Sequence, residues 1–177
     1  MQTKIALVSF AVLASGAALS TTAHAAGGTL NAELTSYQEV PAISSRATGQ
    51  FDGTLSADET TINWTLTWKD NKLTGPASQA HIHFSQEGVN GAIVVFLCTN
   101  LGNGPMGTPA CPTSPGDISG TIDSSDVIAS ASMQGIDAGQ MGKLVRAIRA
   151  GAAYVNIHTA SFPSGEIRGQ VSYTPDL

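Results

Sequence analysis

Three histidines are the residues of this chain whose type and spacing best suit them to chemistry. His81 and His83 flank Ile82, and His158 follows near the C-terminal end. Because side chains alternate between the two faces of a β-strand, His81 and His83 would share an outward face while their apolar neighbours point to the core. The same alternation places His158 on the outward face of its own strand. Three neutral imidazoles on outward faces predict a site for copper or zinc.

An ordinary polar surface is the alternative interpretation of these histidines. His-x-His pairs also occur on strands without a metal, and the sequence does not establish that His158 lies near the pair. If a metal is bound, residues around its ligands are expected to orient the imidazole rings. Candidates for that role are Glu87, Asn156 and Glu166.

The elements that must position the histidines are β-strands. Apolar and polar residues alternate, or form short apolar runs, in eight segments bounded by Gly, Pro and Asn. A hairpin turn is expected at residues 56–60, between the second and third segments. The segments are residues 29–35, 49–55, 61–68, 79–84, 92–98, 117–122, 154–158 and 166–173. This pattern predicts an all-β protein, either a Greek-key β-sandwich or a flattened barrel.

One helix is expected near residues 139–150, where the apolar residues fall on a single helical face. Asp137 is predicted to cap its start and Gly151 to end it. Arg146 and Arg149 suit the negative end of the helix dipole, and a solvated face explains them better than an anion site. A shorter turn is expected to begin at Ser124.

Cys98 and Cys111 are the two cysteines of the chain, and the residues between them are rich in Gly and Pro. An isolated pair on either side of such a loop predicts a disulfide in an oxidising compartment. A thiolate metal site is the weaker alternative because the short Cys-x-x-Cys spacing is missing.

The N-terminus has the three parts of a secretory signal. Lys4 provides the positive charge, an apolar run follows it, and Ala23-His-Ala25 provides a small-residue exit. We expect cleavage after Ala25, which gives a leader of residues 1–25 and one mature β domain of residues 26–177. The apolar run is too short for a convincing membrane span, so no stable span is expected after cleavage. These features predict an exported protein, periplasmic or extracellular.

Composition and motifs exclude several classes of function. The net charge is −5 and becomes one unit more negative when Lys4 leaves with the leader. Scattered basic residues in an acidic chain provide no footprint for nucleic acid. The chain also lacks a Gly-x-Ser-x-Gly elbow, a phosphate-binding Gly loop and a free cysteine nucleophile. A protein partner is not indicated.

Three long stretches and one short element form an ordered series of motifs in this chain. The stretches cover residues 80–98, 144–159 and 163–171, and the short element is Glu39-Val-Pro41. Together they resemble the CHRD domain, the module named after chordin, from about Leu30 to Tyr173. The resemblance implies a secreted β-rich domain. In animals such domains belong to an antagonist of bone morphogenetic proteins, whereas bacterial single-domain members mostly lack an assigned function. The cysteine-rich modules of chordin are absent, so growth-factor binding is not carried over.

The order of the motifs is also similar, more distantly, to the copper/zinc superoxide dismutase barrel. A His-x-His strand, a cysteine-bearing loop, a strand ending in histidine and a closing strand with an arginine follow one another. The likeness implies that His81, His83 and His158 match copper ligands and that Arg168 is a poorly aligned counterpart of the active-site arginine. This chain has no histidine between His83 and His158, so the bridging ligand and the zinc cluster are missing. Dismutase activity is therefore doubtful.

Two hypotheses of different class follow, with a third beside them. In the first, the protein is an exported CHRD-domain binding module that holds copper or zinc at His81, His83 and His158. In the second, it is a redox enzyme whose three-histidine copper site meets superoxide or another small oxidant. An extracellular structural or adhesive module without metal is the third, and scarce charge with a Ser/Thr-rich surface would suit it.

Overall fold

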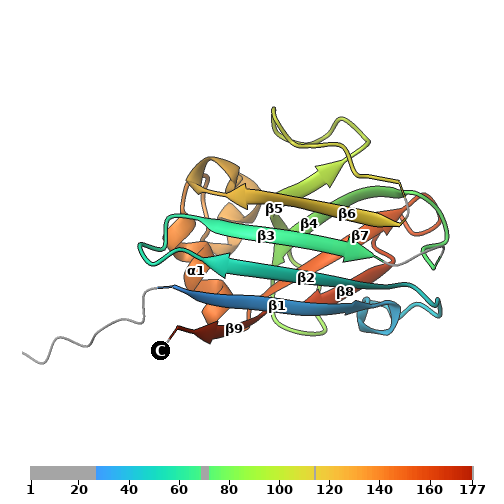
Figure 1. Cartoon of the computed structure of the whole chain (residues 1–177), viewed down its shortest axis with the longest axis horizontal. Coiled ribbons are helices and arrows are strands. Elements are labelled where there is room, and N and C mark those ends of the chain that lie inside the picture. Colours follow the sequence, from blue (N-terminus) through green and yellow to red (C-terminus); the bar gives the residue numbers. More distant parts are fainter. Residues whose placement is uncertain (1–26, 69–71, 114, 177) are drawn as a thin grey trace, which may run out of the picture.

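The computed structural model describes residues 27–68, 72–113 and 115–176. Within these residues nine strands form one antiparallel sheet that curves into a flattened, nearly closed barrel (Figure 1). The strands are β1 Gly28–Thr35, β2 Thr48–Leu55, β3 Ile62–Trp68, β4 Ala77–Phe84, β5 Ala92–Thr99, β6 Gly116–Ile122, β7 Ala153–Thr159, β8 Ile167–Gln170 and β9 Ser172–Pro175. The predicted all-β class is confirmed, and the architecture is the flattened barrel. The predicted leader, residues 1–25, lies outside the described residues.

The order of the strands places segments that are distant in sequence side by side. Along the sheet the order is β5-β4-β7-β8-β1-β2-β3-β6, and β9 also pairs with β1. One layer contains β6, β3, β2 and β1, and the other contains β5, β4, β7 and β8 (Figure 1). The pairing of β3 with β6 and that of β4 with β7 join strands that are not consecutive in the chain, as in a Greek key. The pairing of β4 with β7 brings the histidine-bearing strands together.

The core lies between the two layers and follows from the alternation of the strands. In β3, Ile62, Trp64, Leu66 and Trp68 are buried, and the residues between them point outward. The indole of Trp68 packs so closely on β6 that a Cβ at Gly116 would lie 1.8 Å from the ring. A larger residue at position 116 would therefore displace the tryptophan.

The helix α1, Met141–Arg149, lies at one end of the barrel (Figure 1). Its residues Val145 and Ile148 line a small internal gap together with Leu30, Leu55 and Ile62 of the core. Gly151 follows the helix with a positive φ of 66°, as predicted for its end. The prediction that Asp137 caps the start is wrong.

The start of α1 differs because a turn precedes it. Gln140 is the N-cap residue and makes no side-chain cap hydrogen bond. The backbone N–H of Asp137 instead donates to Oε1 of Gln140 at 3.0 Å. Asp137 therefore lies one turn before the helix rather than at its first residue.

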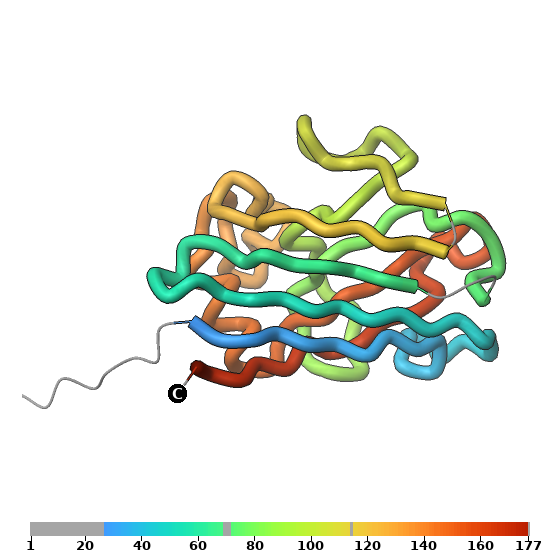
Figure 2. The backbone as a smooth tube through the Cα atoms, viewed as in Figure 1, coloured from blue at the N-terminus to red at the C-terminus, as the bar shows by residue number. Residues whose placement is uncertain are grey.

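The segment predicted as one strand over residues 166–173 is divided into β8 and β9. At the break, the backbone N–H of Val171 donates to the carbonyl of Ala153, and β9 then pairs with β1. Figure 2 shows this C-terminal segment running alongside β1. The turn expected at Ser124 is present as a short 3₁₀ helix, and two further 3₁₀ helices were not predicted. The three are η1 Ser36–Gln38, η2 Ser124–Asp126 and η3 Ala129–Gln134.

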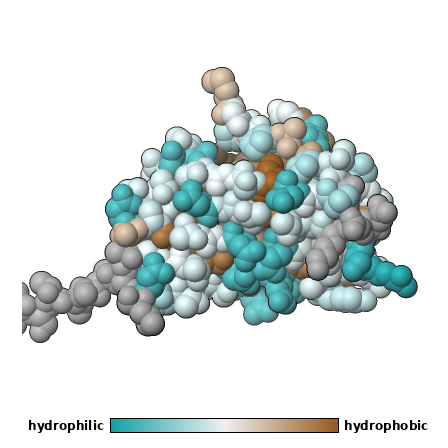
Figure 3. Space-filling view, in the orientation of Figure 1, coloured by the Kyte–Doolittle hydropathy of each residue, from teal (hydrophilic) through white to brown (hydrophobic). Residues whose placement is uncertain are grey.

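The outer face of the β1-β2-β3-β6 layer is polar and carries little charge. Figure 3 shows hydrophilic and neutral residues over most of it. A shallow hollow in this face is lined mainly by hydroxyl, amide and carboxylate side chains, among them Thr29, Asn31, Asp52, Asn63 and Thr121. Among the helices that the structure describes, none combines the length and apolar character needed to cross a membrane.

Candidate metal site

The pairing of β4 with β7 brings the three histidines together. In this antiparallel pair His81 is opposite Asn156, and Gln79 is opposite His158. His158 is therefore a diagonal neighbour of His81 on the same face of the sheet, within reach of a long side chain. Four of the residues predicted to bind the metal or to orient its ligands lie on this face: His81, His83, His158 and Asn156.

Irregular pairing on the other side of β4 adjusts the direction of the histidines. The register of β4 with β5 shifts between Ala80 and His81 and again between Ile82 and His83. Such bulges re-aim side chains locally. As a result Phe96 of β5 lies against His81, with 4.4 Å between the ring centroids.

The ring nitrogens lie at distances suited to a shared metal ion. Nδ1 of His81 is 3.2 Å from Nε2 of His158. One nitrogen from each of the three histidines forms a group in which all lie within 4.8 Å of one another. Three such atoms lie within about 2.8 Å of a common point, so inward shifts of less than about 1 Å would give metal bonds of about 2.0–2.1 Å.

Backbone carbonyls fix the orientation of two of the rings. Nδ1 of His83 donates to the carbonyl of Gly91 at 2.9 Å, and Nδ1 of His158 donates to the carbonyl of Pro163 at 3.0 Å. Because a carbonyl oxygen only accepts, Nδ1 carries the hydrogen in both rings and Nε2 keeps a lone pair. Metal-binding histidines are held in this way in other proteins.

All three rings are buried, although their face was expected to be the outside of the sheet. His81 is 0 %, His83 8 % and His158 6 % exposed. The expected alternation holds, because Ala80 and Ile82 face the core. The outward face is buried because Phe96, the loop bearing Gly91 and the loop bearing Pro163 cover it.

Burial keeps the imidazoles neutral. It lowers the pKa of His81 to about 2, with smaller contributions from the neighbouring histidines. It lowers the pKa of His83 to about 4, partly offset by the hydrogen bond to Gly91. The pKa of His158 is also lowered by burial. At neutral pH each ring is therefore uncharged and keeps one nitrogen lone pair beside its single N–H.

A stack of side chains extends from the histidines to Arg168. The ring of Tyr154 lies parallel to that of His83, with centroids 4.6 Å apart, and the guanidinium of Arg168 lies 4.3 Å from the centre of the Tyr154 ring. Arg168 donates to Oδ1 of Asn90 at 2.9 Å and to the carbonyl of Val89 at 3.3 Å. This arrangement ties the loop before Gly91, and hence the partner of His83, to β8.

Glu39 is a buried carboxyl group beside this stack. It packs against Gly165, where an added Cβ would lie 2.5 Å from its Oε1. Burial raises its pKa to about 7, against the opposing effect of Arg168. Its Oε1 has no hydrogen-bond partner among the described residues. Glu39 therefore borders the loop that carries Pro163 without belonging to the histidine cluster.

The residues expected to orient the ligands have different positions. Asn156 is opposite His81, and its Oδ1 is a buried acceptor that lacks a partner in the part of the chain described. Glu166 is buried but accepts from Thr74 and Thr159, the residue after His158, instead of from a histidine. Glu87 is exposed. The guanidinium of Arg168 stacks on Tyr154, which in turn stacks on His83.

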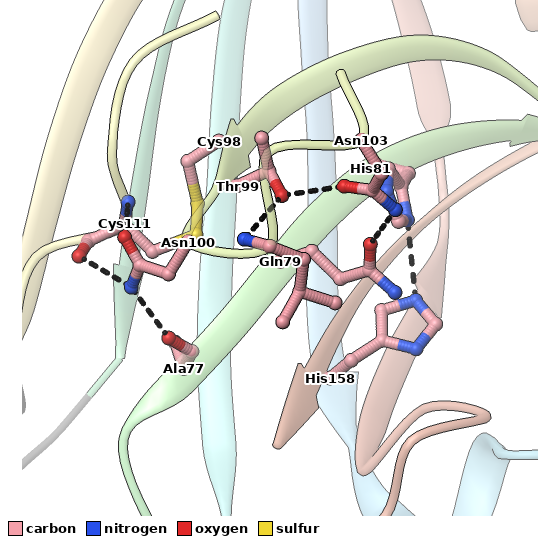
Figure 4. Close-up of a disulfide and its surroundings, with 10 residues drawn as sticks. Ala77, Gln79, His81, Cys98, Thr99, Asn100, Asn103, Cys111 and His158 are labelled. Carbon is pink, nitrogen blue, oxygen red and sulfur yellow. Dashed lines mark hydrogen bonds between the residues drawn. A yellow bond between two sulfur atoms is a disulfide. The ribbon is translucent and has the colours of Figure 1, made fainter. Parts of the chain in front are cut away.

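The disulfide Cys98–Cys111 is formed, with an S–S distance of 2.04 Å. Figure 4 shows the loop that it closes and the polar contacts linking this loop to β4. Asn103 donates to Oε1 of Gln79 at 3.0 Å, and Gln79 is the cross-strand partner of His158. The loop is therefore attached to the strand position next to the candidate site.

Residues that complete the site were not singled out from the sequence. Tyr154, Phe96 and the carbonyl groups of Gly91 and Pro163 are close in space to the histidines but not in the chain. Tyr154 alone carried a signal, because it shares the alternating face of β7 with Asn156 and His158. The backbone carbonyls of Gly91 and Pro163 carried no sequence signal, because every residue type has a backbone carbonyl.

The fold and the site together define a small antiparallel β-barrel with one disulfide and a buried cluster of three histidines. A family model described as the CHRD domain matches residues 30–171. The match covers most of the chain, and the chain belongs to the CHRD domain family. Among curated proteins, no relative matches it.

Proposed function

We propose that this protein is an exported CHRD-domain module that binds one copper or zinc ion through His81, His83 and His158. The observation that carries the proposal is the 3.2 Å separation of Nδ1 of His81 from Nε2 of His158. Two nitrogens bound to one ion at about 2.0–2.1 Å, with an angle of about 90–110° between the bonds, lie about 2.8–3.4 Å apart. This pair of histidines therefore needs little movement to share an ion.

The hydrogen-bonding groups around the rings support the same proposal. Nε2 of His83 is buried and lacks a protein partner among the described residues, as a lone pair reserved for a ligand would. In the metal-free protein the hydrogen between His81 and His158 belongs to His81, because Nε2 of His158 accepts. A metal ion would replace that hydrogen, and Nε2 of His81 would carry it instead. The buried Oδ1 of Asn156, the cross-strand neighbour, is then available to accept it.

Export is part of the proposal and has separate support. Residues 1–25 have the pattern of a cleaved secretory leader. The disulfide Cys98–Cys111 suits an oxidising compartment, periplasmic or extracellular. N-terminal sequencing of protein recovered from that compartment should give Ala26 as the first residue. Recovery of an intact Met1 would contradict the leader.

Binding is preferred to catalysis because the histidines are closed off from solvent. A redox enzyme must admit its small oxidant to the metal, whereas none of the three rings is more than 8 % exposed. A structural or adhesive role without metal would leave the unpartnered nitrogens of His81 and His83 unexplained. Both alternatives are outcomes of the experiment below.

Metal uptake by protein prepared without an affinity tag tests the proposal. The stripped protein should take up one equivalent of copper or zinc, and the double variant His81→Ala with His158→Ala should take up none at that site. His158→Gln alone keeps a side-chain donor for the Pro163 carbonyl and controls for loss of folding, which circular dichroism would report. Unchanged uptake in a folded double variant would refute the metal site. Uptake with superoxide turnover would favour the redox enzyme.

A further inference from the structure

We infer that the three-histidine site selects monovalent copper, Cu(I), over divalent zinc and divalent copper. The inference rests on the proposed function, because it concerns which ion the same three residues hold. It adds a preference that neither the family nor the types of the ligands specify, since imidazole nitrogen binds all three ions.

The first observation is the charge of the ligand set. The cluster consists of three histidines, and in the described part of the chain no carboxylate or thiolate belongs to it. Neutral imidazoles add no negative charge, so the bound group keeps the full charge of the ion. That charge is one unit for Cu(I) and two for zinc or Cu(II).

The second observation is the burial of the ligands. His81 is fully buried, and His83 and His158 are nearly so. An ion held between them exchanges most of its water for protein. The free energy of moving an ion out of water scales with the square of its charge, so a divalent ion loses about four times as much hydration as a monovalent one. Without an anionic ligand, the site offsets less of that difference than a site with a carboxylate or thiolate would.

The third observation is a buried cation close to the cluster. The guanidinium of Arg168 stacks on Tyr154, which stacks on His83. Arg168 is itself 2 % exposed, so solvent screens its charge weakly. Repulsion between this cation and a bound ion is twice as large for a divalent ion as for Cu(I). Glu39, the carboxyl group that interacts with Arg168, lies outside the histidine cluster.

The number of ligands favours the same ion. Zinc is almost always four-coordinate and completes a three-residue site with water. Rings that are at most 8 % exposed leave a fourth ligand little access from solvent. Cu(I) has a filled d shell and a single charge, and three nitrogen ligands satisfy it.

Competition titrations with the untagged protein test this inference. The protein is titrated anaerobically with Cu(I) against a chromogenic Cu(I) chelator, and separately with Zn(II) and Cu(II) against matched chelators. We expect Cu(I) to bind roughly 100-fold more tightly than either divalent ion. A 100-fold preference over Cu(II) corresponds to a rise of about 120 mV in the copper reduction potential relative to the free ion couple, at 59 mV for each tenfold change. Direct measurement of that potential gives a second readout.

Asn156→Asp tests the physical cause, because it adds a negative charge beside His81 with almost no change of shape. The preference for Cu(I) over zinc should fall by about 10-fold or more in this variant. Asn63→Asp is the matched control, since Asn63 lies on the exposed outer face of β3 and accepts a hydrogen bond that aspartate also accepts. The control should leave the preference unchanged.

The outcomes separate this inference from the proposed function. Tight binding of Cu(I) with weak binding of the divalent ions supports both. Zinc or Cu(II) bound as tightly as Cu(I) overturns the inference and leaves the metal site standing. An unchanged preference in a folded Asn156→Asp variant overturns the charge argument. Failure of every ion to bind overturns the proposed function as well.

Discussion

Nδ1 of His81 lies 3.2 Å from Nε2 of His158, although 77 residues separate the two in the chain. The contact exists because β4 and β7, far apart in sequence, are neighbours in the sheet. Backbone carbonyls of Gly91 and Pro163 accept hydrogen bonds from Nδ1 of His83 and Nδ1 of His158 and fix those two rings. The site is therefore organised by the barrel and its loops before any ion is bound.

Gly91→Ala should weaken metal binding by about 10- to 100-fold, the usual effect of losing a group that orients a ligand. A Cβ at Gly91 would lie 1.9 Å from the carbonyl oxygen of Phe84, so the loop must move and the partner of His83 moves with it. Gly75→Ala is the control, because a Cβ there meets nothing within 4 Å. Equal metal affinity of the two variants in a chelator competition would refute the role of the Gly91 carbonyl.

Metal affinity should stay nearly constant from pH 8 to pH 5. Protons compete with a metal for an imidazole only near and below its pKa, and burial lowers the pKa of His81 to about 2 and that of His83 to about 4. The pKa of His158 is lowered as well. Exposed histidines, by contrast, lose metal below their usual pKa of about 6.5. A steep loss of affinity between pH 6.5 and pH 5, measured by competition at each pH, would contradict the burial of the site.

Much of the fold could be predicted, because alternation within each strand is a local property of the sequence. The facing of His81 and His83 away from Ile82 followed from it. The pairing of the two cysteines followed instead from their isolation on either side of a Gly- and Pro-rich loop. Alternation does not tell whether loops cover an outward face. That is why the burial of the histidines, which depends on Phe96 and on the loops bearing Gly91 and Pro163, was not foreseen.

The sequence pattern also did not predict the hydrogen-bond partners of Glu166 or the residue at which α1 begins. Glu166 was expected to orient a ligand, yet it anchors Thr74 and Thr159, because the loop before β4 folds over it. Asp137 was expected to cap α1, but Gln140 occupies that position. Glu166 has a partner that is distant in sequence, and the turn before α1 moves the helix start to Gln140; the local pattern specifies neither.

Glu39→Gln should change how stability depends on pH. The pKa of Glu39 is raised from 4.5 to about 7 by burial, so the folded state binds its proton more tightly than the unfolded state does. The wild type is therefore most stable relative to the variant below pH 4.5, and this relative stability falls by about 3 kcal/mol as the pH rises through 7. Urea unfolding of both proteins from pH 4 to pH 8 measures the difference. A wild type that becomes more stable relative to the variant as the pH rises would show the opposite sign and refute the assignment.

Removal of the disulfide by Cys98→Ser with Cys111→Ser should reduce the free energy of unfolding by about 3 kcal/mol, mainly through the larger entropy of the unfolded chain. The paired serines leave the polar contacts of the loop, among them those with Ala77 and Gln79, to hold it in place. Denaturant unfolding of the variant, compared with the oxidised and the reduced wild type, measures the effect. If the variant is as stable as the oxidised protein, the loop is held by its polar contacts and not by the disulfide.

The central claim is that one ion binds between His81, His83 and His158, and a crystal of the copper-loaded protein tests it most directly. An anomalous difference map recorded at the copper absorption edge should show one strong peak, about 2.0–2.1 Å from a nitrogen of each ring. A loaded crystal in which this position is empty, or in which copper lies elsewhere on the protein, would contradict the claim.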